Sequence, residues 1–586
     1  MSTSRDPSGG AAQELRTFLD AEWKEWLAES PETATAVGFP GFDDRWTDDS
    51  PEGVERRRGH LSASLGRITR IDRSLLPEGE RLNYDLYREM LESAQAGLRF
   101  GFDPQPLRGT GPRNLWMPLT HLDGIHTLAP ETLDIQPRRS IPELERYVAR
   151  LEALPVALDQ NRALLATGLA KGFTPPRGPL ESLPELVSNL IPSDAASSPL
   201  LQPFVPAADA LAPSERDRLM RRATEAYAKG IVPAAERLRD YLSHEYVPHC
   251  RTSIANTALP DGAAAYNYLV RWHTTTSLTP QEVHALGLAE VQRIREAMQG
   301  VMRDSGFPGD FPSFLHFLRT DPQFFFASEE ELIDRYRVIA KRTDPALSAV
   351  FGRLPRLPYG VLPVPEYRAR VSPAAYYIPG VPSTGRPGYF YANAYALDAR
   401  PRWEMESFVL HESVPGHHLQ IALNQELEDV PQFRRFASYS AFIEGWGLYA
   451  ESLGRELGHY RDPYSRYGQL SFDMWRSIRL VVDTGMHALG WTRERAIQFF
   501  LENTGKSEHD VTVEVDRYIV WPAQSLAYKI GQLKFRELRT LAEERLGDRF
   551  DVRAFHDVVL GEGALPLPVL EQRVRRWIEA RASASR

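Results

Sequence analysis

The spacing of the apolar residues constrains this chain more than any other feature, because it follows the period of an α-helix over most of the sequence. Large apolar side chains recur every three or four residues between positions 12 and 28, and similar patterns return at 329–343, 435–457 and 523–546. The segment that begins at Thr279 carries a capping box and a proline in its first helical turn. We therefore expect a mainly α-helical protein.

Strand-like sequence is scarce. The best example is GYFYANAY at residues 388–395, which is rich in aromatic residues and bounded by a Gly-Arg-Pro-Gly turn. It predicts a small β-sheet just before the motif HESVPGHH, residues 411–418. The segment is compatible with an edge strand that pairs with an extended peptide, and equally with an ordinary packed strand.

Length and composition set the expected organisation. With 586 residues, of which 42% are hydrophobic and 25% charged, the chain can bury a large core. We expect a disordered tail over 1–12, an N-terminal helical region over 13–250 and a second helical region over 251–586. The two helical regions are expected to form one continuous unit, since the boundary signal near 250–265 is weak.

Several classes of protein are disfavoured. The net charge of -9 comes without any Lys/Arg run, which argues against nucleic acid as a partner. No stretch of about 18 apolar residues predicts a membrane span. The single cysteine, Cys250, excludes an internal disulfide, and the N-terminus resembles no signal peptide. These features predict a cytoplasmic protein.

The motif HESVPGHH begins like the zinc-peptidase signature H-E-x-x-H and then departs from it. In that signature the second histidine lies four residues after the first, about 6 Å away on the same helix face. This chain has Pro415 at that position. On a regular helix His418 would lie about 10 Å along the axis from His411, and His417 would point about 120° away from it. A regular helix therefore cannot form a zinc site here.

Pro415 and Gly416 allow the chain to depart from regular helix geometry at this point. Proline removes a backbone donor and glycine tolerates unusual dihedral angles, so the pair can form a bulge that swings a histidine back beside His411. His417 is the predicted ligand, because it directly follows the glycine and needs the smaller correction. His418 is then expected to face packing or substrate. The competing interpretation is a surface helix broken by Pro-Gly.

Two acidic residues complete the candidate site. Glu412 stays beside the first histidine, where it can hold a water molecule and act as a general base. Glu444 lies in an otherwise apolar helical turn, where a carboxylate is costly unless it is paired or binds a metal. His411, His417 and Glu444 are thus candidate zinc ligands, since two histidines, a glutamate and a water form a common catalytic zinc set. A surface acid is the alternative for Glu444.

Four long motifs resemble the bacterial family known as domain of unknown function 885. In chain order they are HESVPGHHLQ, FIEGWGLYAE, RLVVDTGMHALGW and VDRYIVWPAQSLAYKIGQLKFRELR. The resemblance extends over most of the chain. It implies a relation to the zinc metallopeptidases with a glutamate ligand (gluzincins), a large helical deep-cleft fold, and peptidase or amide-hydrolase chemistry. It leaves the substrate open.

Polar residues in the last two motifs are candidates for supporting roles. Peptide hydrolysis builds an oxyanion, which Arg517, Tyr518 or Tyr528 could stabilise, although ordinary packing also explains each of them. Asp483 and His487 lie four residues apart on one helix face. They are compatible with orienting a ligand histidine or with a satisfied polar pair in the core.

A second His-Glu pair occurs in SHEYVPHC, residues 243–250. Its later histidine, His249, follows His244 by five residues, and no glycine accompanies the intervening proline. We expect no metal site there.

The leading hypothesis is a zinc-dependent hydrolase of a peptide or peptide-like amide bond, with zinc as cofactor and Glu412 as general base. The alternatives are a hydrolase of a non-peptide amide or ester in a biosynthetic pathway, and a non-catalytic peptide-binding protein of the same fold. An intact Glu412 argues against the pure binder, which has no need of a base.

Overall fold

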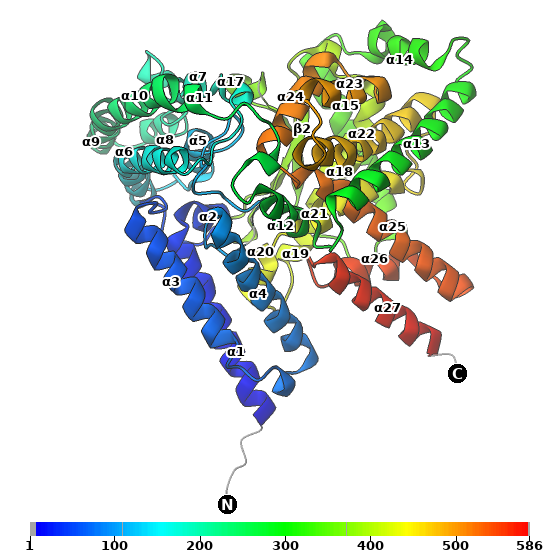
Figure 1. Cartoon of the computed structure of the whole chain (residues 1–586), viewed down its shortest axis with the longest axis horizontal. Coiled ribbons are helices and arrows are strands. Elements are labelled where there is room, and N and C mark those ends of the chain that lie inside the picture. The colour runs from blue at the N-terminus through cyan, green and yellow to red at the C-terminus, as the bar shows by residue number, and fades with distance from the viewer. Residues whose placement is uncertain (1–6, 108, 110, 371, 584–586) are drawn as a thin grey trace, which may run out of the picture. The chain divides into compact units, whose positions relative to one another are not determined.

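The structure is a computed structural model that describes residues 7–583 except 108, 110 and 371. It is mainly helical with one small sheet, as the apolar spacing predicts (Figure 1). The chain divides into two compact units: the N-terminal unit extends to Ala265 and includes Pro431–Phe433, and the C-terminal unit contains Tyr266–Val430 and the chain from Arg434 onward. None of the described helices is long and apolar enough to cross a bilayer.

The boundaries differ from the predicted ones. Arg251 stays in the N-terminal unit because its carbonyl accepts a hydrogen bond from the Arg177 amide at 2.8 Å and its guanidinium donates to the Thr174 carbonyl at 2.8 Å. Helix α1 begins at Pro7, so residues 7–12 of the expected tail are helical, while residues 1–6 lie outside the described part of the chain. The structure also has two compact units where one continuous unit was expected.

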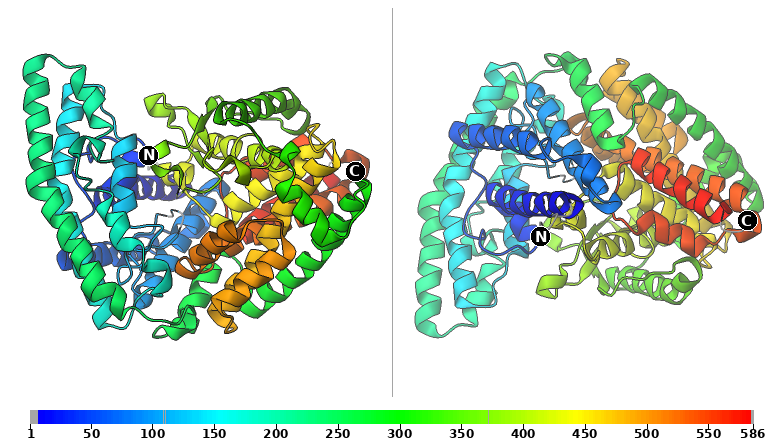
Figure 2. Two further views of the ribbon diagram at one scale, coloured as in Figure 1. Left: turned by 90° about the horizontal axis from the view of Figure 1, so that it is seen from above. Right: turned by 90° about the horizontal axis from the view of Figure 1, so that it is seen from below.

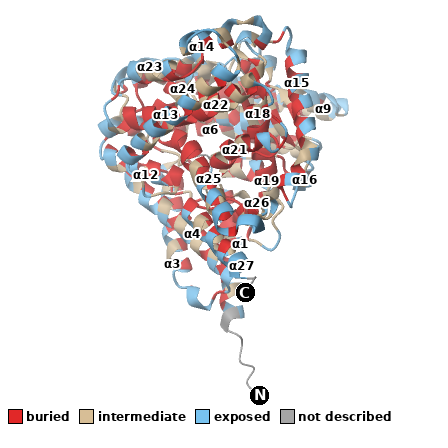
Figure 3. Cartoon of the chain, turned by 90° about the vertical axis from the view of Figure 1, so that its right-hand side faces the viewer, coloured by how far each residue is buried: buried red, intermediate tan, exposed pale blue. Residues whose placement is uncertain are grey.

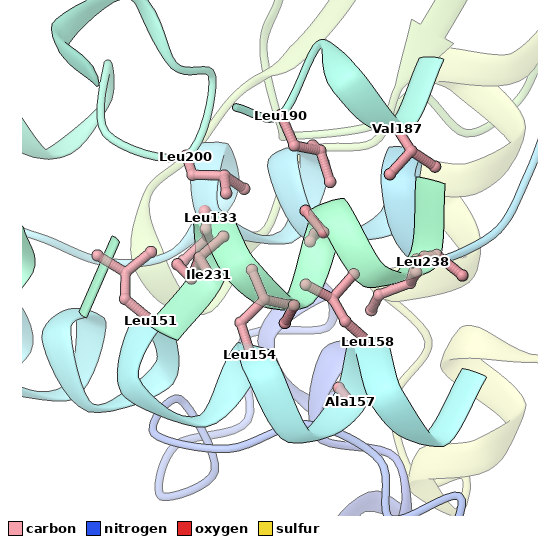
Figure 4. Packing of buried hydrophobic residues seen from close by; sticks show 14 of the residues in the cluster. Leu133, Leu151, Leu154, Ala157, Leu158, Val187, Leu190, Leu200, Ile231 and Leu238 are labelled. Atoms are coloured by element: carbon pink, nitrogen blue, oxygen red, sulfur yellow. The ribbon is translucent and has the colours of Figure 1, made fainter. Parts of the chain in front are cut away.

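Leucines at helical spacing build the core of the N-terminal unit. Leu151, Leu154 and Leu158 of α6 are fully buried, and they pack with Ile231 and with Leu238 of α10 (Figure 4). The helices of this unit are α1 (Pro7–Glu29), α2 (Pro31–Ala36), α3 (Pro51–Ile68), α4 (Glu78–Gly97), α5 (Ile125–Ile135), α6 (Ile141–Ala170), α7 (Leu183–Ser188), α8 (Phe204–Asp209), α9 (Pro213–Glu225), α10 (Val232–Tyr241) and α11 (Val247–His249).

Long helices also dominate the C-terminal unit, which Figure 2 shows from above and below. The capping box expected at Thr279 and Glu282 is present at the start of α13. The helices here are α13 (Pro280–Asp304), α14 (Phe311–Thr320), α15 (Glu329–Thr343), α16 (Leu347–Val350), α17 (Glu366–Ala369), α18 (Met405–Glu412), α19 (His417–Gln425), α21 (Ser440–Ser452), α22 (Pro463–Ala488), α23 (Arg493–Asn503), α24 (Glu508–Val520), α25 (Ala527–Leu546), α26 (Val552–Leu560) and α27 (Leu567–Ser583); α12 (Gly262–Thr274) and α20 (Gln432–Phe436) contain the division points.

Two glycines bring α21 against α25. A Cβ atom on Gly445 of α21 would collide with the backbone of Gly531 on α25, and one on Gly531 would collide with the carbonyl oxygen of Ala441. Close approach of the two backbones buries α21 deeply, and Figure 3 shows α18, α21 and α22 largely in the colour of buried residues. The helices that carry the candidate site therefore lie in the core of this unit.

The sheet has the strand order β1-β3-β2, with β1 (Tyr359–Pro363) parallel and β2 (Ala375–Ile378) antiparallel to β3 (Gly388–Ala392). The strand expected at 388–395 is present, but the edge-strand interpretation is wrong, because β3 is paired on both sides. Phe390 of β3 is fully buried and belongs to the same hydrophobic cluster as Val409 of α18. This packing places the sheet next to the helix that begins the candidate site.

Candidate metal centre

The helix that contains His411 breaks where the sequence predicts, but it breaks completely instead of bulging. Helix α18 ends at Glu412 and α19 begins at His417. A Cβ atom at Gly416 would collide with the carbonyl oxygens of Leu410 and His411, so only glycine fits this close return of the chain. The Pro415 carbonyl accepts a hydrogen bond from the Trp446 indole at 2.8 Å, which ties the turn to α21.

The break brings the three predicted ligands together. The Oε2 atom of Glu444 lies 3.4 Å from Nε2 of His417 and 3.6 Å from Nε2 of His411. One ligand atom from each of the three residues lies within 4.8 Å of the other two ligand atoms. The corners of a tetrahedron around zinc, with bonds near 2.1 Å, are about 3.4 Å apart. The two separations from Glu444 fit a single zinc ion.

The surroundings of Glu444 also suit a cation. Its Oε2 atom is buried and receives no hydrogen bond of good geometry within the described chain. Burial by itself raises the pKa of the Glu444 carboxyl, but the imidazoles of His411 and His417 hold this pKa well below its usual range. The carboxylate is therefore charged and poorly hydrogen-bonded, which is costly in a protein interior unless a cation compensates.

The second ring nitrogen of His411 is held by an acid that sequence analysis missed. Nδ1 of His411 lies 2.8 Å from Oε1 of Glu451, which is fully buried. Metal-binding histidines commonly donate this hydrogen bond to a carboxylate, which fixes the tautomer and the ring orientation. Burial disfavours the charged ring, but the nearby carboxylates of Glu444 and Glu451 raise the pKa of His411 to about 9.

A signal for Glu451 is present in the sequence. It follows Glu444 by seven residues, two helical turns, and so lies on the same face of an otherwise apolar helix. Gly447 lies between them, and a Cβ atom there would stand 2.8 Å from Cε1 of the His411 ring. The motif FIEGWGLYAE thus supplies a candidate ligand, space for the His411 ring and an acid that contacts this ring, all from one helix face.

His417 and His418 have different contacts. The Nδ1 atom of His418 lies 2.9 Å from the Tyr377 hydroxyl, and its Nε2 atom lies 3.0 Å from the carbonyl oxygen of Leu357. These contacts tie α19 to the sheet region and turn His418 away from Glu444. The Nδ1 atom of His417 is buried and has no hydrogen-bond partner in the described chain, so the orienting acid of His411 has no counterpart here.

Glu412 ends α18 directly beside this group. It is 8% exposed, and burial raises the pKa of its carboxyl, while His411 and His417 oppose that rise. A raised pKa moves a carboxylate toward the range in which a general base works best near neutral pH.

The three oxyanion candidates differ in position. The Tyr528 ring lies 6.4 Å from the His411 ring between centroids and is nearly parallel to it, at 16°. A guanidinium nitrogen of Arg517 lies 3.4 Å from the Tyr528 hydroxyl. The Tyr528 ring therefore adjoins the candidate metal centre, and Arg517 contacts the Tyr528 hydroxyl.

Tyr518 is a correction to the predicted set. Its hydroxyl donates to Glu514 at 2.6 Å and accepts hydrogen bonds from Arg479 at 2.8 Å and from the Trp475 indole at 3.1 Å. The single donor of Tyr518 is therefore used, and the residue is 1% exposed. Tyr518 is a core residue that fixes Arg479.

Asp483 takes the packing role that was the alternative to orienting a ligand. Its carboxylate accepts hydrogen bonds from the Tyr266 hydroxyl at 2.6 Å, the Ser525 hydroxyl at 2.8 Å and the Ala523 amide at 3.1 Å. His487 contacts the carbonyl oxygen of Tyr518 at 2.8 Å. The carboxylate that contacts a candidate ligand histidine is Glu451.

Other groups of potential ligands are explained by packing. His244 and His249 each place Nδ1 against a backbone carbonyl of their own helical segment, and neither belongs to a group of three potential ligands among the described residues. Among the described residues, one further group of ligand types gathers, Glu22, Glu25 and His60. There Glu22 already accepts hydrogen bonds from Trp26, Tyr87 and the guanidinium of Arg67, so its charge is compensated.

Comparison with known proteins fits the resemblance seen in the motifs. The sequence pattern of a family described as bacterial protein of unknown function (DUF885) matches residues 31–574. The chain belongs to this family. No curated protein matches this DUF885 protein significantly.

Two solved structures share its fold. One is described as a candidate lipoprotein from Colwellia psychrerythraea; it has 27% sequence identity and a TM-score of 0.88, over 97% of this chain and 100% of that chain. The other is a candidate lipoprotein of unknown function from Shewanella oneidensis, with 16% identity and a TM-score of 0.69, over 95% of this chain and 99% of that chain. The match at 16% identity shows a similarity of fold alone.

Proposed function

We propose that this DUF885 protein is a zinc-dependent hydrolase of a peptide or peptide-like amide bond. The observation that carries the proposal is the convergence of His411, His417 and Glu444, with Glu412 beside them and Glu451 behind His411. Zinc bound there would polarise a carbonyl and acidify a water molecule. The gluzincin relation and a deep substrate cleft are part of the proposal.

Several residues of the chain have separate roles in such a reaction. The Glu412 carboxylate accepts the proton of the attacking water and returns it to the leaving nitrogen. Glu451 keeps the Nδ1 proton of His411 in place, so that Nε2 points toward His417 and Glu444. The Tyr528 hydroxyl, with Arg517 3.4 Å away, donates to the oxygen that becomes negative.

The test is metal analysis followed by digestion of a peptide mixture, with product mass spectrometry. We expect one zinc per chain after incubation with zinc and removal of the excess. Cleavage of peptides should stop on chelation and return when zinc is restored. Absence of stoichiometric zinc would refute the metal centre, and zinc without cleavage would favour the peptide-binding protein or a hydrolase of another amide or ester.

The cytoplasm is the location we propose from the sequence. Both similar structures are described as candidate lipoproteins, so location needs a direct measurement. Fractionation of the native host cells, followed by immunodetection, checks it, and recovery in the membrane fraction would contradict the cytoplasmic assignment.

A further inference from the structure

Three guanidinium groups gather around Tyr528; we refer to Arg476, Arg479 and Arg517 as the arginine cluster. The Cζ atoms of Arg476 and Arg479 lie 5.9 and 4.5 Å from the centre of the Tyr528 ring, and Arg517 reaches the hydroxyl at 3.4 Å. The same ring is nearly parallel to the ring of His411, 6.4 Å away between centroids. The arginine cluster therefore adjoins the metal centre.

Two of these arginines share one carboxylate partner. A nitrogen of Arg479 lies 3.2 Å from Glu514, and a nitrogen of Arg517 lies 3.6 Å from the same carboxylate. Arg479 also donates to the Tyr518 hydroxyl at 2.8 Å. These contacts account for the fixed positions of both side chains.

Arg476 is buried and forms no hydrogen bond with a carboxylate, although its guanidinium lies over the Phe472 ring, 4.6 Å from the ring centre. Its side chain is 7% exposed, and its ion pair, with Glu451, spans 3.7 Å. Its hydrogen bond to the Phe472 carbonyl is long, at 3.5 Å, and its buried Nε atom has no hydrogen-bond partner in the described chain. Glu451 is moreover shared with His411. A buried guanidinium in this state is costly unless an anion pairs with it.

We propose that Arg476 binds a carboxylate of the substrate, so that the protein removes residues from the free C-terminal end of a peptide. A planar guanidinium pairs with a carboxylate through two parallel hydrogen bonds, which gives both energy and orientation. This inference rests on the proposed hydrolase function and names the substrate class of the same site.

The position of Arg476 sets how far the carboxylate lies from the scissile bond. One side chain, Glu451, contacts both Arg476 and the ligand His411. Because an extended peptide advances about 3.5 Å per residue, a carboxylate held by Arg476 belongs to the first or second residue after the bond that is cut. The expected products are single residues or dipeptides from the C-terminus.

The test compares three N-blocked tetrapeptides on the zinc-loaded protein. The first has a free C-terminal carboxylate, the second has a C-terminal amide, and the third has the amide and a glutamate as its last residue. We expect kcat/KM for the free acid to exceed that for the plain amide by about tenfold or more, the size of one charge-assisted contact. Arg476→Gln should bring this ratio close to one.

Arg466→Gln is the matched control, because Arg466 lies on the same helix but pairs with exposed Asp304. It should keep the ratio of the parent protein. Equal rates for acid and amide in the parent protein would overturn the inference and leave the hydrolase proposal intact, whereas cleavage of none of a broad peptide mixture would count against the hydrolase itself. Preference for the glutamate amide over the free acid would overturn the assignment to the C-terminal end.

Binding gives a readout that does not depend on turnover. Calorimetry on Glu412→Gln protein should show tighter binding of the free acid than of the amide, and a loss of that difference when Arg476→Gln is added. Circular dichroism checks that the double variant folds. Should Arg476→Gln fail to fold, Arg476→Lys keeps the charge but loses the planar fork, so the ratio of the two substrates should fall only in part. An unchanged ratio in Arg476→Lys would contradict the paired-hydrogen-bond geometry.

Discussion

His417 and His418 are neighbours in sequence but meet different surroundings. His417 directs Nε2 at Glu444, while His418 uses both ring nitrogens in hydrogen bonds to Tyr377 and Leu357. The difference arises because the chain turns at Gly416 and a new helix begins at His417, which places the His417 ring 4.7 Å from the His411 ring between centroids. Which side chain can bind a metal is thus decided by one backbone turn.

His417→Ala should lose the zinc, since it removes one of three ligands. His418→Ala should keep it, and should lower the free energy of unfolding by roughly 2 kcal/mol because two buried hydrogen bonds disappear. Elemental analysis after dialysis and urea unfolding measure the two effects. A folded His418→Ala protein without zinc would show that the ligand has been misassigned.

Glu412→Gln should retain zinc and the fold but lower kcat by about 10²–10⁴, because it removes the proton acceptor and leaves the ligands in place. Steady-state kinetics on a cleaved peptide measures the effect. Glu428→Gln serves as control, since Glu428 is an exposed acid just after α19. Turnover near the parent value in Glu412→Gln would assign the base elsewhere.

At the scale of elements, glycines determine how closely the helices of the centre approach. Gly416 allows α19 to start against the end of α18, and Gly447 leaves room on α21 for the His411 ring. Gly445 and Gly531 bring α21 against α25, which carries Tyr528. The geometry of the centre depends on these contacts as much as on the ligands.

Gly447→Ala should weaken zinc binding at least tenfold, because the new Cβ atom would lie 2.8 Å from the His411 ring and force it to shift. Gly300→Ala is the control: a Cβ atom there meets only the far end of Arg303, at 3.8 Å. That control should raise the free energy of unfolding by about 0.5–1 kcal/mol, the usual gain for alanine over glycine within a helix. Competition with a metal indicator measures affinity. Equal zinc affinity of Gly447→Ala and the parent would mean that the ring can move without cost.

At the scale of the whole molecule, the candidate ligands come from α18, α19 and α21 of one compact unit. A ligand that binds only the folded protein stabilises it by mass action, by about 4 kcal/mol at a thousandfold excess over Kd. Chelation should therefore lower the Tm of this unit by several degrees. In His417→Ala protein the chelator should leave Tm unchanged. Calorimetric scans measure both, and an equal shift in the two proteins would point to a metal site elsewhere.

The reactivity of Cys250 indicates whether the N-terminal unit is folded. It is the single cysteine of the chain, and burial raises the pKa of its thiol to about 12. Because the thiolate is the reactive form, the folded protein should not react with a thiol reagent at about pH 8. Reaction should begin as denaturant unfolds this unit. Fast labelling of the native protein would contradict the buried position.

The helical character of the chain, the strand at β3 and the start of α13 could be predicted from sequence, because each depends on residues close together along the chain. The break after Glu412 could be predicted in the same way from Pro415 and Gly416, and the position of Glu444 in an apolar turn singled out that acid before its neighbours in space were known. Sequence patterns reflect local backbone preference and the cost of burying a charge, and these two effects are sufficient to predict the features named in this paragraph.

Only the tertiary structure distinguished the surroundings of Tyr528 from those of Tyr518, showed that Glu451 contacts His411 while Asp483 does not, and revealed the sparse polar contacts of Arg476. Each of these depends on hydrogen bonds between helices far apart in the sequence, such as Tyr518 to Arg479 and His411 to Glu451. The boundary at Ala265 depends in the same way on the contacts of Arg251 with Thr174. Whether a polar side chain is used in packing or left available is decided by its neighbours in space, which the local spacing of residues does not encode.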